Sequence, residues 1–328
     1  WTRGLKNHVA RNIEHSIKLK DLICGYYRPF CVQNFYYDTN FIESPGLCKQ
    51  IFPSNFENYS IVVSGTATNK DFSTLISNKT IDFSLLGISQ CFPLYWYEEK
   101  DKGNSKQQSL FGNEDTDDKY IRHDGITDFI HQQAKEKYGH KVTKEDIFYY
   151  VYGILHSEDY RTKFAANLKK MLPRIPLVDK TDDFWAFSNA GRDLAKLHLN
   201  YEDQAPLSSV KVSGEESGNF KVTKMKFKSK EDKSEIIYND SIKVSNIPAE
   251  AYEYVVNGKS AIEWILDRYQ VTINKDSQIK NDPNDWAEEH NQPRYILDLL
   301  LSVISLSVAT VKIVKSLPKL SFEDSKEK

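Results

Sequence analysis

Residues 141–201 read KVTKEDIFYYVYGILHSEDYRTKFAANLKKMLPRIPLVDKTDDFWAFSNAGRDLAKLHLNY, and the rest of the chain is organised around this stretch. Its first half predicts a helix, because Thr143 is a good N-cap and Asp146 completes a capping-box pattern three residues later. A kink is expected near His156 and Ser157, and two prolines end the run. Apolar side chains recur at helical spacing throughout it: Phe148, Val151, Tyr152, Leu155, Tyr160, Phe164, Leu168 and Leu172.

A second helix is predicted in the same stretch, after the acidic cap Thr181-Asp182-Asp183. Its apolar side chains share one face: Phe187, Ala190, Leu194 and Leu197. The flanking sequence favours strands at 60–64, 81–88, 91–97, 209–212, 219–227, 235–238 and 241–244, with further helices at 1–20, 249–255 and 261–269. We therefore expect an α+β fold. It would have a β-rich N-terminal part, a central helical block, a small antiparallel sheet and a long C-terminal helix.

Composition divides the chain into three parts. Residues 1–100 are β-rich, residues 101–125 form a polar linker, and residues 126–328 hold the central helices, the lysine-rich sheet and the C-terminal helix. The linker is rich in Asp, Glu, Lys, Gly and Asn and has almost no apolar anchor. The first residue is Trp1, and we interpret the chain as a piece of a longer polypeptide.

The longest apolar run lies near the C-terminus, between Tyr295 and Val314. It contains Asp298, Lys312 and four Ser or Thr residues, which favours a helix buried on one side over a membrane span. We expect the seam of Leu299, Val303 and Leu306 to pack against the block 144–199. No signal peptide is recognisable, and the four cysteines form no CxxC pair. These features predict free thiols in a soluble cytoplasmic protein with no membrane partner.

No catalytic motif is recognisable in the sequence. Gly258-Lys259-Ser260 resembles the end of a phosphate-binding loop, but Glu253 stands where that motif requires Gly. There is no GxSxG or HExxH motif. His156 and His198 are more simply interpreted as structural than as catalytic, and the acidic residues near Glu231 as solvated hairpin charges.

The 44 basic and 46 acidic side chains nearly balance, so a role in nucleic-acid binding must depend on a local patch. The candidate patch has five lysines within ten residues that contain no acid: Lys221, Lys224, Lys226, Lys228 and Lys230. On a strand with a bulge near Lys224, several would project from one face and could contact DNA phosphates. An ordinary exposed strand kept soluble by lysine explains them equally well. A second candidate is the small polar loop 64–70, which contains Asn69 and Lys70.

Several segments resemble Type ISP restriction–modification enzymes, specifically their C-terminal target-recognition domain. They include YRPF (27–30), FYYD (35–38), QCFPLYWYE (90–98), KEDIFYYVYGILHSEDYRTKFAANLKKMLPRIP (144–176), FWAFSNAGRDLAKLHLNYE (184–202), AYEYVVNGKSAIEWILDRYQV (251–271), NDPNDWAEE (281–289) and PRYILDLL (293–300). Together these segments cover most of the chain in one order. The last piece of an adjoining adenine-N6 methyltransferase could lie at the front, within residues 1–100.

The resemblance implies a DNA-binding segment that catalyses nothing by itself. Its partners would be double-stranded DNA and the methyltransferase and motor domains of the same polypeptide. AdoMet, ATP and Mg would be held in the rest of the enzyme, with no cofactor here. The residues that read bases are expected in the low-resemblance stretches 100–124 and 208–246. The rival interpretation is a protein-interaction module that uses aromatic helices such as 147–155, and the terminal helix from Ile296, as a partner surface.

Overall fold

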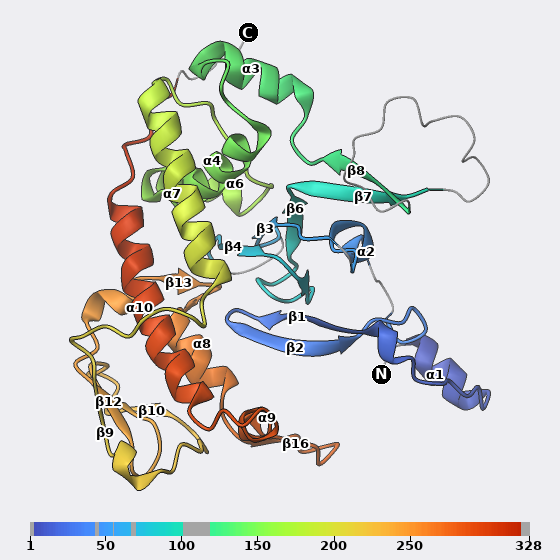
Figure 1. The fold of residues 1–328 in the computed structure, drawn as a ribbon, viewed down its shortest axis with the longest axis vertical. Coiled ribbons are helices and arrows are strands. Elements are labelled where there is room, and N and C mark those ends of the chain that lie inside the picture. The colour runs from blue at the N-terminus through green and yellow to red at the C-terminus, as the bar shows by residue number, and fades with distance from the viewer. Residues whose placement is uncertain (1–2, 43–45, 55, 67–69, 101–118, 323–328) are drawn as a thin grey trace.

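The computed structural model describes residues 3–42, 46–54, 56–66, 70–100 and 119–322. The N-terminal part is β-rich, as predicted, and its strands form three small sheets with the orders β2-β1-β5, β4-β3-β6 and β7-β8 (Figure 1). The strands are β1 (Leu22–Arg28), β2 (Cys31–Tyr36), β3 (Ser60–Val63), β4 (Thr74–Ser77), β5 (Thr80–Ile81), β6 (Gln90–Pro93), β7 (Tyr95–Glu99) and β8 (Tyr120–Asp124). Three short helices accompany them: α1 (Arg3–Ala10), η1 (Leu19–Asp21) and α2 (Cys48–Ile51).

Strand β3 lies between two hydrophobic cores and contributes side chains to both. All four of its residues are buried, and successive side chains of a strand point to opposite faces. Ile61 and Val63 therefore join a core built with the central helices, whereas Val62 joins a core built with the C-terminal part. The sheet of β3 therefore connects the core of the central helices to the core of the C-terminal part.

The central helical block follows the prediction closely. It consists of α3 (Asp128–Tyr138), α4 (Lys144–His156), α5 (Glu158–Lys163), α6 (Ala165–Leu168) and α7 (Thr181–Leu199). Thr143 and Asp146 form the predicted capping box at the start of α4. The predicted kink is a break in the helix, since α4 ends at His156 and Ser157 caps α5. Gly153 and Gly191 let α4 and α7 pack closely, because a Cβ on either would overlap a carbonyl oxygen of the other helix.

The C-terminal part combines small sheets with helices. Its strands are β9 (Lys211–Ser213), β10 (Lys226–Phe227), β11 (Ile236–Ile237), β12 (Lys243–Ser245), β13 (Val255–Val256), β14 (Lys259–Ser260), β15 (Thr272–Ile273) and β16 (Lys280–Asn281). Its helices are η2 (Glu215–Ser217), η3 (Ala249–Tyr252), α8 (Ala261–Arg268), α9 (Pro283–Glu289) and α10 (Tyr295–Lys315). Strands β10, β11, β12 and β9 form one antiparallel sheet in that order, which completes the predicted α+β architecture.

The long C-terminal helix α10 lies beside α7 (Figure 1) and contributes side chains to both cores. Its predicted seam is buried at Leu299, Val303 and Leu306, but all three belong to the C-terminal core and not, as expected, to the core of the central block. Helix α10 as a whole packs against α8, η3 and α7, and Ile313 and Val314 near its end reach the central core. By length and composition α10 could cross a membrane. However, 72% of its most apolar window is buried in the fold, as in the core helix of a soluble protein.

Several predicted elements are shorter than expected, and three of them clearly so. The predicted helix 1–20 is α1 followed by irregular chain and the single turn η1. The predicted strand 81–88 stops at Ile81, because the Asp82 side chain accepts a hydrogen bond from the backbone N–H of Ser84 and starts a turn. The predicted helix 249–255 is only the 3₁₀ turn η3.

The predicted strand 219–227 is also wrong, since only Lys226 and Phe227 are in a strand. Side chains replace the ladder partners: the Asn284 amide bonds both the N–H and the C=O of Val222, at 2.9 and 2.8 Å. The Asn239 amide donates to the carbonyls of Asn219 and Lys221. The bulge expected near Lys224 is therefore not needed, because that residue belongs to no ladder.

Strands β7 and β8, which flank residues 101–118, pair with each other. Strand β8 pairs with β7 along its whole length, so Tyr120–Asp124, at the end of the predicted linker 101–125, is strand. Residues 101–118 lie outside the described part of the chain.

Candidate nucleic-acid interface

The five lysines of the segment 221–230 are all exposed. Two of them have acidic partners: Lys221 pairs with Glu288 of α9, and Lys228 lies 3.6 Å from a carboxylate oxygen of Asp232. In the parts of the chain that the structure describes, Lys224, Lys226 and Lys230 have no ion pair. The segment therefore keeps free positive charge, but fewer free lysines than the sequence suggested.

The sheet adds two lysines that the sequence analysis did not single out. Lys226 lies opposite Ile237, which lies opposite Lys243, and Lys211 lies opposite Ser245. Directly opposed residues, and residues two apart on one strand, share a face of a sheet. Lys211, Lys226 and Lys243 therefore lie on one exposed face, which we call the lysine face. Strands β10, β12 and β9 contribute these lysines, and β11 lies between β10 and β12.

The opposite face of the same sheet is apolar and explains why the lysines point outward. Phe227, Ile236, Val244 and Val212 form one row across the four strands and pack in or against the C-terminal core. The alternating triplet Lys-Val-Ser occurs at both 211–213 and 243–245. This alternation is the signal from which the two further lysines could have been predicted.

The second predicted candidate, the loop 64–70, is only partly described. Asn69 lies outside the described residues. The Lys70 side chain lies beside Gly258, at the turn between β13 and β14, and its Cδ would be 3.6 Å from a Cβ at that glycine. Nearby, the backbone N–H of Asn257 donates to the hydroxyl of Ser73 at 2.8 Å. Lys70 and Ser73, at the end of the loop and just after it, therefore lie against the β13–β14 turn.

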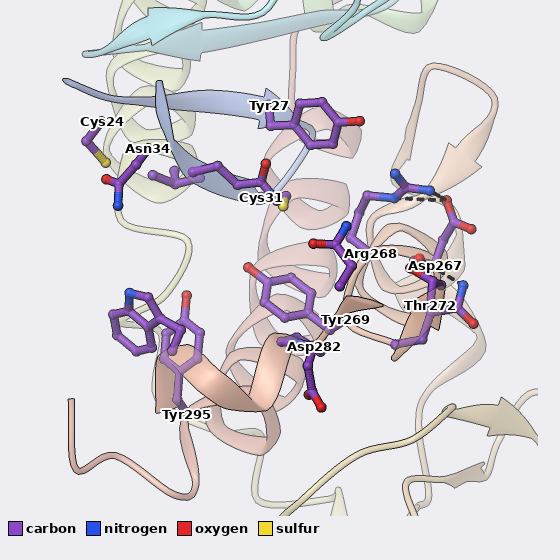
Figure 2. Close-up of a pocket in the computed structure, with 16 residues that line it drawn as sticks. Cys24, Tyr27, Cys31, Asn34, Asp267, Arg268, Tyr269, Thr272, Asp282 and Tyr295 are labelled. Carbon is purple, nitrogen blue, oxygen red and sulfur yellow. Dashed lines mark hydrogen bonds and ion pairs between the residues drawn. The ribbon is translucent and has the colours of Figure 1, made fainter. Parts of the chain in front are cut away.

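A polar cleft of about 480 Å³ separates the β1–β2 hairpin from the C-terminal elements α8, β15, β16 and α9. Figure 2 shows Tyr27 and Asn34 on the hairpin side, with Arg268, Thr272 and Asp282 across from them. A volume of this size is within the range of ligand-binding sites.

The charged side chains of the cleft are held in fixed positions. Nε and Nη2 of Arg268 donate to one carboxylate oxygen of Asp267, at 3.1 and 2.7 Å, and Lys259 donates to the same oxygen at 2.9 Å. Burial would raise the pKa of Asp267, but the hydrogen bonds from Lys259 and Arg268 outweigh burial and lower it. Asp267 is therefore an anion that orients Arg268. The nearby Cys31 is a buried neutral thiol, since burial raises its pKa to about 11.

The two helical histidines are buried, and the four cysteines form no disulfide. All four cysteines are free, as predicted, although Cys24 is exposed. His156 and His198 lie in a buried cluster with Tyr152 and Tyr254. Burial lowers the pKa of both imidazoles, that of His198 to about 3, so both are neutral at physiological pH. No group of His, Cys, Asp or Glu within the described ranges could hold a metal ion.

The fold and these surfaces define a binding module that presents lysines, carboxamides and aromatic rings on small β-structures. The chain belongs to the Type ISP C-terminal specificity domain family, whose sequence model matches residues 1–299. No curated protein matches the sequence significantly.

Three solved structures are similar over nearly the whole chain. A nuclease-deletion mutant of the Type ISP restriction-modification enzyme LlaGI, in complex with a DNA substrate mimic, is 37% identical with a TM-score of 0.81 over 99% of this chain. The ATP-dependent Type ISP enzyme LlaBIII bound to DNA is 37% identical with a TM-score of 0.85 over 98% of the chain. The DrdV–DNA complex is 28% identical with a TM-score of 0.81 over 98%. The matches cover 27%, 20% and 31% of those chains, so this chain spans less than a third of each.

Proposed function

We propose that this chain recognises a specific base sequence in duplex DNA for a longer restriction–modification enzyme. The observation that carries the proposal is the match of residues 1–299 to a specificity-domain family. The similar LlaGI, LlaBIII and DrdV structures, which all contain DNA, support it. The lysine face supplies exposed cations of the kind that neutralise phosphates, and such contacts position a protein on DNA without reading sequence.

In this mechanism the domain holds the duplex while other parts of the enzyme perform the chemistry. Side chains at base edges select the site in the major groove. A target adenine is then extruded into the pocket of an adenine-N6 methyltransferase, because the reactive atom is not accessible inside the helix. The methyltransferase, an ATP-dependent translocase and a nuclease would belong to the longer polypeptide, together with AdoMet, ATP and Mg.

We further propose that the chain itself is non-catalytic and binds no cofactor. The family is a specificity domain, and the sequence has no phosphate-loop, AdoMet or metal motif. Titration calorimetry of the purified chain with AdoMet should give no heat of binding. Saturable binding would contradict the proposal.

The proposed function is tested by selection from a randomised duplex pool. The full chain is incubated with the pool at moderate salt, and bound DNA is amplified and sequenced over several rounds. Enrichment of one motif is the expected result. Binding without enrichment would leave only non-specific attachment, and no binding at all would favour the rival interpretation.

The helix 147–155 does not offer the partner surface that the rival interpretation needs, because Ile147 and Leu155 of α4 are buried inside the central core. A different surface suits docking within a longer enzyme. No residue of α1 is buried, and apolar side chains of the N-terminal segment are exposed: Val9, Ile13, Ile17, Leu19 and Leu22. We propose that this segment packs against the methyltransferase or motor part of the same polypeptide in the cytoplasm. Slower hydrogen exchange at residues 9–22 in the longer enzyme than in the isolated chain would support this contact.

A further inference from the structure

The hairpin β15–β16 projects from the C-terminal part of the molecule (Figure 1). All residues from Thr272 to Asn281 are exposed, so the hairpin adds nothing to either core. Two isoleucines in it, Ile273 and Ile279, are 60% and 67% exposed. Because the hairpin buries no side chain, a contribution to the stability of the fold does not explain its presence.

The hairpin is nevertheless held in one conformation. The side-chain oxygen of Asn274 accepts hydrogen bonds from the backbone N–H groups of Asp276 and Ser277, at 3.0 and 2.9 Å. The backbone of Asn274 bonds Ile279 at 3.0 Å and Gln278 at 2.9 Å. A tip ordered in this way loses little conformational entropy on binding.

The side chains of the hairpin match the chemistry of base edges. Lys275 has no acidic partner in the described chain, and neither Thr272 nor Asn281 makes a side-chain hydrogen bond there. Lysine suits guanine, asparagine suits adenine, and an apolar group suits the thymine methyl. Asp276 is the only acid between residues 272 and 281, and Lys280 is neutralised by Asp282 at 2.7 Å.

The dimensions of the hairpin also match DNA. Two paired strands are about 5 Å apart, and the major groove, about 12 Å wide, admits such a ribbon. The root of the hairpin, at Thr272 and Asn281, lines the cleft that also holds Asn34 and the fixed Arg268 (Figure 2). A duplex that takes the tip in its groove therefore meets further donors and acceptors at the root.

We propose that the hairpin β15–β16 enters the major groove of DNA and reads base edges through Lys275 and Asn281. The inference rests on the proposed function and goes beyond it by naming the reading element. It differs from the sequence-based expectation, which placed the readers in residues 100–124 and 208–246.

The test compares variants in selection from a randomised duplex pool. Lys275→Ala and Asn281→Ala each remove one proposed reader. A third variant replaces residues 274–279 by an Asn-Gly turn, which closes a two-residue hairpin. Lys312→Ala is the matched control, because Lys312 is an exposed lysine on α10. Circular dichroism before selection checks that each variant is folded.

The expected result is a loss of preference at specific positions of the motif, by about 5- to 150-fold for each base that is no longer read, with affinity for scrambled duplex nearly unchanged. The control should enrich the wild-type motif. If all three hairpin variants also enrich the wild-type motif with wild-type affinity, the inference is overturned and the proposed function stands. If the wild-type chain itself enriches nothing, the proposed function fails, and the inference fails with it.

Discussion

The His198 imidazole in α7 connects two helices that are far apart in sequence, because its Nε2 lies 3.0 Å from the hydroxyl oxygen of Thr310 in α10. Its Nδ1 lies 2.7 Å from the hydroxyl of Tyr152 in α4. A neutral imidazole satisfies both partners when it accepts from Tyr152 and donates to Thr310. Helices α4, α7 and α10 are therefore linked by hydrogen bonds at one buried histidine.

This arrangement predicts that the chain loses stability in acid. The folded-state pKa of His198 is depressed to about 3, first by burial and then by the charge of Arg161. In the unfolded chain it returns to about 6.5. The stabilising effect is therefore complete above pH 6.5 and is lost as the pH falls toward 3. The free energy of unfolding, measured by urea titration between pH 7 and 4, should fall by about 1.4 kcal/mol for each pH unit below 6.5 for this group.

Two substitutions separate this titration from simple loss of packing. His198→Gln should lower stability at pH 7 and flatten the acid dependence. Thr310→Val should lower stability and retain the dependence, since the buried imidazole remains. Equal pH slopes for the wild type and His198→Gln would contradict the assignment.

The close packing of α4 on α7 predicts a large effect from one methyl group. Gly191→Ala should destabilise the fold by about 1–3 kcal/mol, because the new Cβ would overlap the carbonyl oxygen of Tyr149 and force the helices apart. Ala is otherwise the better helix former, so an exposed glycine would change in the opposite direction. Asp193→Ala, on the exposed side of α7, is the control. A thermal midpoint for Gly191→Ala at or above that of the wild type would rule out this packing.

Burial of the α10 seam predicts that a charged side chain placed there strongly destabilises the fold. Val303 is fully buried, so Val303→Asp places an unpaired charge in the C-terminal core and should cost more than about 4 kcal/mol. Lys312→Asp, on the exposed side of the same helix, should cost about 1 kcal/mol or less. Chemical denaturation of both variants checks the difference. Similar midpoints would mean that the seam does not face the core.

The helical part of the fold was predictable because its signals are local. The Thr143 capping box, the break at Ser157 and the buried seam of α10 all depend on residues within a few turns of one another. The prediction of a strand at 219–227 was wrong for the opposite reason. The backbone partners of this segment are the side chains of Asn239 and Asn284, and nothing within the segment indicates them.

The candidate site was predictable only in part, for the same physical reason. Local charge identified Lys226, but Lys243 joins it only through the pairing of both residues with Ile237, and Lys211 through pairing with Ser245, more than thirty residues away in sequence. The hairpin β15–β16 was missed because exposure is a property of the folded molecule. Ile273 and Ile279 look like core residues until the structure places them in solvent.

The lysine face predicts a change in salt dependence. Replacing Lys211, Lys226 and Lys243 by Gln should weaken binding to every duplex alike, because phosphate contacts carry no base information. The slope of log affinity against log salt should flatten by about 0.9 for each phosphate that the variant no longer neutralises. The control replaces Lys170, Lys196 and Lys312, which changes the net charge equally.

Filter binding over a salt series distinguishes the outcomes. Unchanged slopes in the lysine-face variant would mean that these lysines only keep the sheet soluble. A changed sequence preference with intact non-specific binding would make them base readers instead.

The most direct measurement of the central claim is the ratio of two affinities of the wild-type chain, for the motif enriched in selection and for a scrambled duplex of the same composition. Both should be measured at physiological salt, because affinities for DNA have meaning only at a stated salt concentration. Sequence-specific recognition predicts that the enriched duplex binds at least about a thousandfold more tightly. Equal affinities would contradict the assignment of this chain as a DNA target-recognition domain.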